Sequence, residues 1–250
     1  MSPARVRRTR WLAGSVVGVA VLCAGAAAVA TARDDGSAPA AASAPRTPSA
    51  GSADAGFARE MAVHHQQAVE MSFVVRDRTK DEDVRRLAYD IANTQANQRG
   101  MLLGWLDLWE LPKTTPAGQE PMAWMSGHGH HDGHAGGHGG GGHGGGGHGG
   151  GGHGGGEAGF EAHDGALMPG MATRTELKAL GAAEGVKAEV LFLQLMTDHH
   201  KGGVTMAEGC AELCAVPAEK RLAQGMVEAQ RSELDLMADM LAARGAAPRP

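Results

Sequence analysis

The chain has 250 residues, with 23 lysines and arginines against 28 aspartates and glutamates and a formal net charge of −5 at pH 7. This mildly acidic balance argues against nucleic acid as a partner, because binding to phosphates needs a basic face. The sequence has no phosphate-binding loop, dinucleotide fingerprint or Ser-His-Asp order, so it does not indicate the common nucleotide-dependent or hydrolytic enzymes. The 13 methionines outnumber the four phenylalanines and the single tyrosine. Methionine fills cores and is also a soft thioether ligand for metals.

The N-terminal 32 residues have the features of an export segment. Four arginines precede an apolar run over residues 11–30, and Ala30-Thr31-Ala32 forms a small-x-small cleavage site. The run, of about 20 residues, is also long enough to remain as a membrane anchor. We therefore expect an extracytoplasmic protein, either secreted or anchored to the cell membrane, with residues 1–32 as its only membrane contact. Residues 33–53, rich in alanine, proline and serine, predict a disordered linker.

The strongest feature of the sequence is a stretch that occurs twice, at residues 57–72 and 192–208. A constant offset of 135 residues aligns the two copies, as from Phe57 to Phe192. Both copies keep the pattern Met-x2-His-His-x5-Met, and the register continues without a gap into the segments that follow. A repeat of this length indicates two copies of one supersecondary unit.

Start and stop signals divide the first copy into two long helices. Asp54 is expected to cap a helix that runs to about Arg78. Acidic residues at 81–83 suit the beginning of a second helix, which must stop before Pro112. Residues 54–111 are therefore predicted to form the first helical hairpin.

The second copy has similar signals. Thr173-x-x-Glu176 has the spacing of a capping box and predicts a short helix. A long helix is expected over about 186–212, and another from Pro217 to near Gly245. Residues 173–245 are therefore predicted to form the second hairpin.

These elements predict an all-α fold, a ferritin-like four-helix bundle made of two repeated hairpins within one domain, residues 54–245. A low-complexity Gly/His-rich loop over residues 112–172 joins the hairpins and is expected to be disordered. The chain contains no Glu-x-x-His motif, which counts against a ferritin-type di-iron oxidase.

A stripe of methionine and histidine is the candidate metal site. On a helix, Met61, His64 and Met71 lie on one face, and the matching residues of the second copy do the same. Thioether and neutral imidazole ligands suit copper better than magnesium or calcium. The second histidine of each pair, His65 or His200, is rotated by about 100° and is expected beside the stripe. The candidate ligands are Met61, His64, His65, Met71, Met196, His199, His200 and Met206. The alternative is that the stripe is ordinary core.

The second helix of each copy offers polar residues that could hydrogen-bond the inward histidines, as groups around metal-bound imidazole do. They are Gln95, Gln98, Gln230 and Glu233. The alternative is that these residues are surface polar groups.

The Gly/His loop is a second candidate for metal capture. Residues 127–156 contain almost only glycine and histidine, and flexible imidazoles bind Cu(II), Zn(II) or Ni(II) with modest affinity. The loop histidines are His128, His130, His131, His134, His138, His143, His148 and His153. The alternative is a soluble spacer.

Cys210 and Cys214 stand four residues apart near the end of the third long helix. In an exported protein, two thiols at this spacing suggest a local disulfide. They could instead bind a metal as thiolates. The first copy has Val75 and Thr79 at the matching positions, so the cysteines are not part of the repeated design.

The doubled Phe-x3-Met-x2-His-His-x5-Met pattern, with Met168-Pro-Gly-Met171 before the second copy, resembles the domain of unknown function 305 family (DUF305). The resemblance implies a ferritin-like, exported protein and, from some members, copper binding through the eight residues of the stripe. This chain departs from the pattern in two places: Gln98 matches Glu233, and Gly202-Gly203 matches Gln67-Ala68.

The sequence therefore predicts an extracytoplasmic metal-binding protein that buffers, scavenges or delivers copper and does not catalyse a reaction. Its partner would be a metal ion. The main alternative is a structural or interaction bundle with core histidines and a Gly/His spacer. A cuprous oxidase is a minor alternative.

Overall fold

The computed structural model describes residues 47–126 and 160–250. In these ranges it contains α1 (Ala53–Arg78), α2 (Glu82–Leu108), the short 3-10 helix η1 (Ala123–Ser126), α3 (Arg174–Ala182), α4 (Val186–Leu213) and α5 (Pro217–Ala242). The same ranges contain no β-sheet, only an isolated bridge between His163 and Ala166. The predicted all-α fold class is confirmed.

The export segment, most of the linker and the eight loop histidines lie outside the described residues. Among the helices of the described ranges, none combines the length and the hydropathy that a bilayer span requires. The last residues of the predicted disordered linker are ordered, which corrects that prediction at its C-terminal end. The backbone N–H and hydroxyl of Ser52 both donate to the carbonyl of Ser49, at 3.0 and 2.8 Å. Arg59 also donates to the carbonyl of Ala50.

The predicted N-cap of α1 is wrong by two residues. Ser52 caps the helix, and its side chain accepts a hydrogen bond from the N–H of Ala55. The carboxylate of Asp54 reaches the start of α5 instead, where Oδ1 accepts hydrogen bonds from Ala215 (2.9 Å) and Val216 (2.7 Å). Val216 has no side-chain cap of its own. A carboxylate from α1 therefore satisfies backbone donors at the N-terminus of α5.

The other helix ends follow the local signals in the sequence. Asp81 caps α2, and Thr173 with Glu176 forms the expected capping box of α3. Pro217 occupies the first turn of α5, and Gly245 follows that helix with a φ of 66°. A positive φ is a conformation that glycine adopts without a steric penalty, and it ends the helix here.

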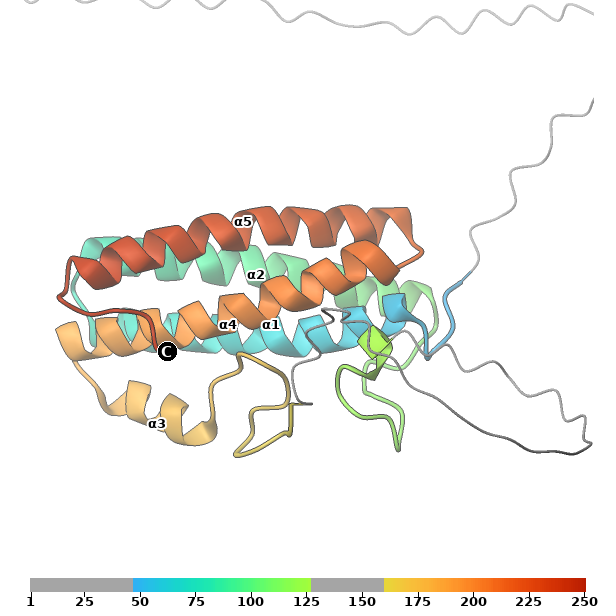
Figure 1. Cartoon of the computed structure of the whole chain (residues 1–250), viewed down its shortest axis with the longest axis horizontal. Helices are drawn as coiled ribbons and strands as arrows, with labels where there is room; N and C mark the ends of the chain where they lie inside the picture. Colours follow the sequence, from blue (N-terminus) through green and yellow to red (C-terminus); the bar gives the residue numbers. More distant parts are fainter. Residues whose placement is uncertain (1–46, 127–159) are drawn as a thin grey trace, which may run out of the picture. The chain divides into compact units, whose positions relative to one another are not determined.

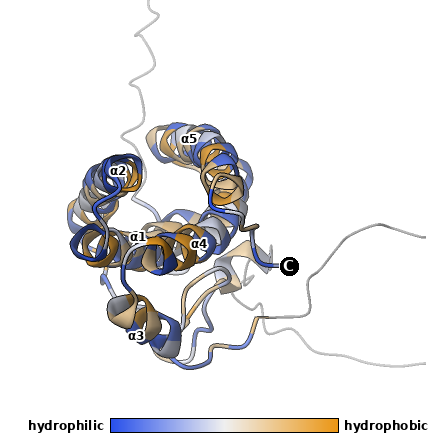
Figure 2. Ribbon diagram, turned by 90° about the vertical axis from the view of Figure 1, so that its left-hand side faces the viewer, coloured by the Kyte–Doolittle hydropathy of each residue, from blue (hydrophilic) through white to orange (hydrophobic). Residues whose placement is uncertain are grey.

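The central layer consists of α1 and α4. Figures 1 and 2 show these two helices side by side, with α2 and α5 on one side of them and α3 on the other. The main helix contacts are α1 with α2, α4 with α5, and α1 with α4, so the two hairpins pack through their first helices. The more detailed expectation of a ferritin-like four-helix bundle stays a prediction. This arrangement buries the helix faces that carry the repeated motif.

Both ends of the predicted loop 112–172 are ordered and pack on the helices, and its Gly/His centre lies outside the described residues. Trp124 is 7% exposed, and its ring lies edge-to-face on Phe57 with centroids 5.8 Å apart. Its Nε1 donates to Oε2 of Glu60 at 2.7 Å. Met168 and Ala172 are also buried. The prediction failed here because apolar side chains outside any periodic pattern can still be buried by packing.

Candidate metal centre

Four imidazoles form a row across the contact between the two hairpins. His64 from α1 faces His199 from α4, with ring centroids 3.7 Å apart and planes tilted by 31°. His65 lies 6.4 Å from His64, and His200 lies 6.2 Å from His199. All four side chains have no exposed surface. The two halves of the row are related by the sequence repeat, and the outer histidines lie beside the stripe as their helical rotation predicts.

Hydrogen bonds fix which nitrogen carries the proton in three of these rings. Nε2 of His65 lies 2.9 Å from Oε1 of Gln98, and Nε2 of His200 lies 2.7 Å from Oε2 of Glu233. Nε2 of His199 lies 2.9 Å from the backbone carbonyl of His64. All three partner atoms are acceptors, so each Nε2 is the donor. In the neutral rings of His65 and His199, Nδ1 therefore keeps its lone pair. Metal-bound histidines show this arrangement, in which one nitrogen donates to an acceptor and the other binds the ion.

The centre contains an unusual number of buried polar atoms without a hydrogen-bond partner. They include Nδ1 of His65, His199 and His200, both ring nitrogens of His64, and the amide nitrogen and oxygen of Gln95 and Gln230. An unsatisfied buried polar group costs about 1–3 kcal/mol. A bound ion would offset part of this cost, because nitrogen lone pairs and amide oxygens can become its ligands.

Burial keeps three of these imidazoles neutral, those of His64, His65 and His199. It is the main cause that lowers the pKa of His64 well below 6.5, and the neighbouring His199 adds to the effect, while the carbonyl of Pro169 acts weakly in the opposite direction. Burial likewise lowers the pKa of His199. For His65, burial lowers the pKa to about 3, although the hydrogen bond with Gln98 opposes the shift. These three rings are neutral at pH 7 and available as ligands without losing a proton.

The four methionines of the stripe are fully buried and lie on either side of the histidine row. Met61 and Met206 belong to one cluster of contacting apolar side chains, and Met71 and Met196 belong to the other. Each cluster thus receives one thioether from each copy of the repeat. The structure thus places all eight candidate ligands, the stripe and the two outer histidines, in the central layer.

The polar residues predicted to support the inward histidines divide into two pairs. Gln98 and Glu233 bond the outer histidines, not the inner ones. Gln95 and Gln230 are 2% and 3% exposed, so the surface alternative is wrong for them. A Cβ built on Gly203 would lie 2.5 Å from Oε1 of Gln230 and 3.2 Å from Cε1 of His64. The absence of a side chain at this position therefore lets the amide and the imidazole approach each other.

The segment before α3 covers the centre, which sequence reasoning missed. Gln67 holds this segment with two hydrogen bonds to the backbone of Ala172, donating to its oxygen at 2.9 Å and accepting from its nitrogen at 2.7 Å. A Cβ on Gly202 would lie 2.1 Å from the carbonyl oxygen of Pro169. The glycines at 202 and 203, a departure from the first copy, are thus positions of close approach. The sequence feature that could have indicated this close packing was the Gly-Gly pair inside a predicted helix.

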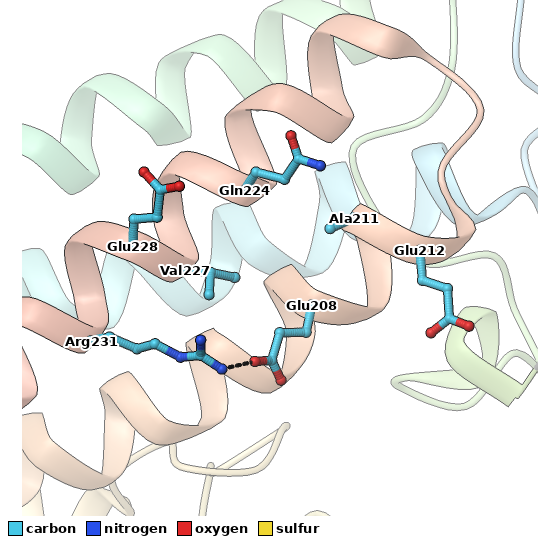
Figure 3. Close-up of a pocket in the computed structure, with 7 residues that line it drawn as sticks. All are labelled: Glu208, Ala211, Glu212, Gln224, Val227, Glu228 and Arg231. Carbon is cyan, nitrogen blue, oxygen red and sulfur yellow. Dashed lines mark hydrogen bonds and ion pairs between the residues drawn. The ribbon is translucent and has the colours of Figure 1, made fainter.

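A surface hollow between α4 and α5 lies apart from the centre (Figure 3). Three glutamates and Arg231 dominate it, and Arg231 pairs with Glu208. The lining residues are Glu208, Ala211, Glu212, Gln224, Val227, Glu228 and Arg231. The matching hollow of the first copy has two aromatic side chains, Phe73 and Tyr89, in its lining and no carboxylate. None of the predicted ligands lines either hollow, and the polarity of this surface is not kept between the copies.

Cys210 and Cys214 are joined by a disulfide, with Cα atoms 4.8 Å apart. Both are buried in the same cluster as Met61 and Met206, and Cys214 is the C-terminal cap of α4. Neither cysteine belongs to the histidine row.

The fold and this centre define a class of protein: an internally duplicated, all-helical domain whose two halves share a buried histidine and methionine centre. The chain belongs to the DUF305 family, a domain of unknown function, whose model matches residues 54–241. The family predicted from the repeated motif is confirmed.

Solved structures show the same fold. A candidate secreted DUF305 protein from Streptomyces coelicolor is 54% identical, with a TM-score of 0.63 over 81% of this chain and 99% of that one. A DUF305 fragment from Deinococcus radiodurans is 26% identical, with a TM-score of 0.53 over 76% of this chain and 96% of that one. CopM in the Cu(I)-bound form is 17% identical, with a TM-score of 0.50 over 76% of this chain and 96% of that one. A search of curated proteins finds no match.

Proposed function

We propose that this protein binds copper outside the cytoplasm, as a buffer, scavenger or carrier, through the histidines and methionines of its central layer. The observation that carries the proposal is the set of buried imidazoles whose Nδ1 atoms have no partner, while their Nε2 atoms donate to fixed acceptors. The Streptomyces coelicolor relative, named as a candidate secreted protein, supports the location. CopM, which shares the fold, is copper-bound in its own structure.

The repeat gives the proposed centre two corresponding halves, one from each copy. One half would use His64 with the thioethers of Met61 and Met206, which lie in one cluster. The other would use His199 with Met196 and Met71, which lie in the opposite cluster. Because each half would use one methionine from each hairpin, copper binding would also link the two hairpins.

The donor set favours Cu(I). Two thioethers and a neutral imidazole are soft to borderline ligands, whereas zinc sites in proteins use thiolate, imidazole or carboxylate. The central imidazoles are also shielded from solvent, so we propose storage or transfer of the ion without turnover. A purely structural centre would leave the same buried polar atoms unpaired, at a cost to stability.

The test is a Cu(I) competition titration of residues 33–250 in which residues 127–156 are replaced by a short Gly-Ser linker, so that the loop histidines do not contribute. The double variant Met61→Leu and Met206→Leu removes both thioethers of one half but nearly keeps their volume. We expect tight Cu(I) binding in the parent protein and a loss of about half the bound copper in the variant. The variant His64→Ala and His199→Ala should lose tight binding altogether.

Met226→Leu is the matched control, because Met226 is fully buried in the same cluster but lies outside the stripe. It should bind as the parent does. Unchanged copper binding in the Met61 and Met206 variant would refute the proposed ligands. A parent protein without tight binding would refute a copper role for the central layer.

A further inference from the structure

A second group of metal-ligating side chains lies at one end of the helices, where the C-terminus of α4 meets the N-termini of α1 and α5. The sulfurs of Cys210 and Cys214 and a carboxylate oxygen of Glu219 all lie within 4.8 Å of one another. All three side chains are buried, with exposures of 0%, 2% and 0%. This group contains no histidine and none of the residues of the proposed copper centre.

Glu219 is a buried acid whose carboxyl group faces another carboxyl group. It lies in the first turn of α5, and neither of its carboxyl oxygens has a hydrogen-bond donor. Its neighbour is a second carboxyl group, Asp54, which is held by the N–H groups of Ala215 and Val216. Burial, together with the charge of Asp54, raises the pKa of Glu219 to about 9, so its carboxyl group is protonated at neutral pH. A buried acid that can only share a proton with another acid is in the environment that a cation would relieve.

We propose that Cys210, Cys214 and Glu219 form a binding site for a divalent, thiolate-preferring cation such as Zn(II), open only when the disulfide is reduced. The cation would displace three protons, one from each thiol and one from the Glu219 carboxyl group, leaving two thiolates and a carboxylate as ligands. Asp54 would lie beside the site and keep its hydrogen bonds to the start of α5. The N-termini of α1 and α5 favour negative charge at this corner.

The geometry is compatible with one ion. Donors bound to the same tetrahedral zinc at about 2.0–2.3 Å lie about 3.3–3.8 Å from one another. The three donor atoms already lie within 4.8 Å, and side-chain rotation can supply the rest once the sulfurs are separated. The Cα atoms of the cysteines, 4.8 Å apart, do not have to move away from each other.

Opening the site is a two-electron reduction. A protein dithiol gives two electrons and two protons to the Cys210–Cys214 disulfide and becomes a disulfide itself, while the two cysteines become thiols. Metal binding then competes with reoxidation, because a thiolate held by the ion is not free to attack another sulfur. The oxidised protein has no thiolate here and should not bind the ion at this corner.

The test uses the full chain and Cd(II), a thiolate-preferring divalent cation whose charge-transfer absorption reports thiolate ligands only, so that the histidines do not contribute. Cys23→Ser removes the third thiol of the chain. We expect no absorption band before reduction and, after treatment with a phosphine reductant, a band that saturates at one Cd(II) per chain. The double variant Cys210→Ser and Cys214→Ser should show no band.

The Glu219→Gln variant tests whether Cd(II) is held by a three-ligand site or by the two thiolates alone. It keeps the size of the side chain but removes the charged ligand, and we expect Cd(II) affinity to fall at least about 10-fold. Glu212→Gln, an exposed glutamate on α4, is the matched control and should bind as the parent does. No band after reduction, or equal affinity in the Glu219 variant, would overturn the proposal. Circular dichroism checks folding: a reduced chain that unfolds and does not refold with Cd(II) would overturn it as well.

Discussion

Gly202→Ala tests whether the segment before α3 is packed as tightly on α4 as the structure indicates. An alanine Cβ would lie 2.1 Å from the carbonyl oxygen of Pro169, 2.8 Å from its carbon and 3.1 Å from Cα of Gly170. All three atoms belong to the backbone, so no side-chain rotation can relieve the contact. The substitution should therefore displace the segment that covers the histidine row.

The expected magnitude is the difference between two opposing effects. Replacing glycine by alanine inside a helix stabilises it by about 1 kcal/mol. Forcing extra volume into a packed interior costs about 1–3 kcal/mol, and more where backbone must move. With a contact at 2.1 Å the cost should be at or above the upper end, which leaves a net destabilisation of about 2 kcal/mol or more. For a domain of this size, that lowers the melting temperature by about 4–8 °C.

The assay is thermal and urea unfolding followed by circular dichroism, with Gly225→Ala as the matched control. Gly225 is an exposed glycine inside α5, and a Cβ there would meet no atom within 4 Å. The Gly225→Ala variant should therefore show only the higher helix propensity of alanine, which raises the free energy of unfolding by about 1 kcal/mol. If Gly202→Ala were as stable as Gly225→Ala, the close packing of residues 168–170 on α4 would be refuted.

Two further predictions concern the buried polar groups. The pKa of His65 in the folded protein, about 3, lies below its ordinary value of 6.5. Its contribution to the free energy of unfolding is therefore complete above pH 6.5 and is lost as the pH falls toward 3. Lowering the pH from 7 to 5 should therefore reduce the free energy of unfolding by about 2 kcal/mol through this residue. In urea unfolding, the stability of His65→Gln should depend less on pH than that of the parent protein, whereas His163→Gln, which changes an exposed histidine, should behave as the parent does. An equal pH dependence of stability in both variants would contradict the lowered pKa of His65. Gln67→Ala should lose about 2–4 kcal/mol, because it leaves the buried N–H and carbonyl of Ala172 unpaired. The neighbouring Gln66→Ala, exposed on the same helix, should change stability little, and equal urea midpoints for the two variants would count against this role.

The helices and the repeat were determined by local sequence. Capping signals at Asp81 and Thr173 and the proline at 217 place helix ends because they act on backbone groups within one turn. The spacing of His64 and His65 placed one imidazole at the contact between hairpins and the other beside it, because the rotation per residue of a helix is fixed. The constant offset between the copies similarly predicted that each half of the centre would contain the same residue types.

The tertiary structure decided what those side chains meet. Asp54 looks like a helix cap in the sequence, but its partners are Ala215 and Val216, which lie 161 and 162 residues further along the chain. Gln95 and Gln98 are both glutamines on α2, yet Gln98 lies within hydrogen-bond distance of His65 whereas the amide of Gln95 has no hydrogen-bond partner. Such contacts join residues distant in the chain, and they depend on how whole helices pack. No local pattern carries that information, which is why the repeated stripe and its candidate polar partners could be predicted but the histidine that each partner bonds could not.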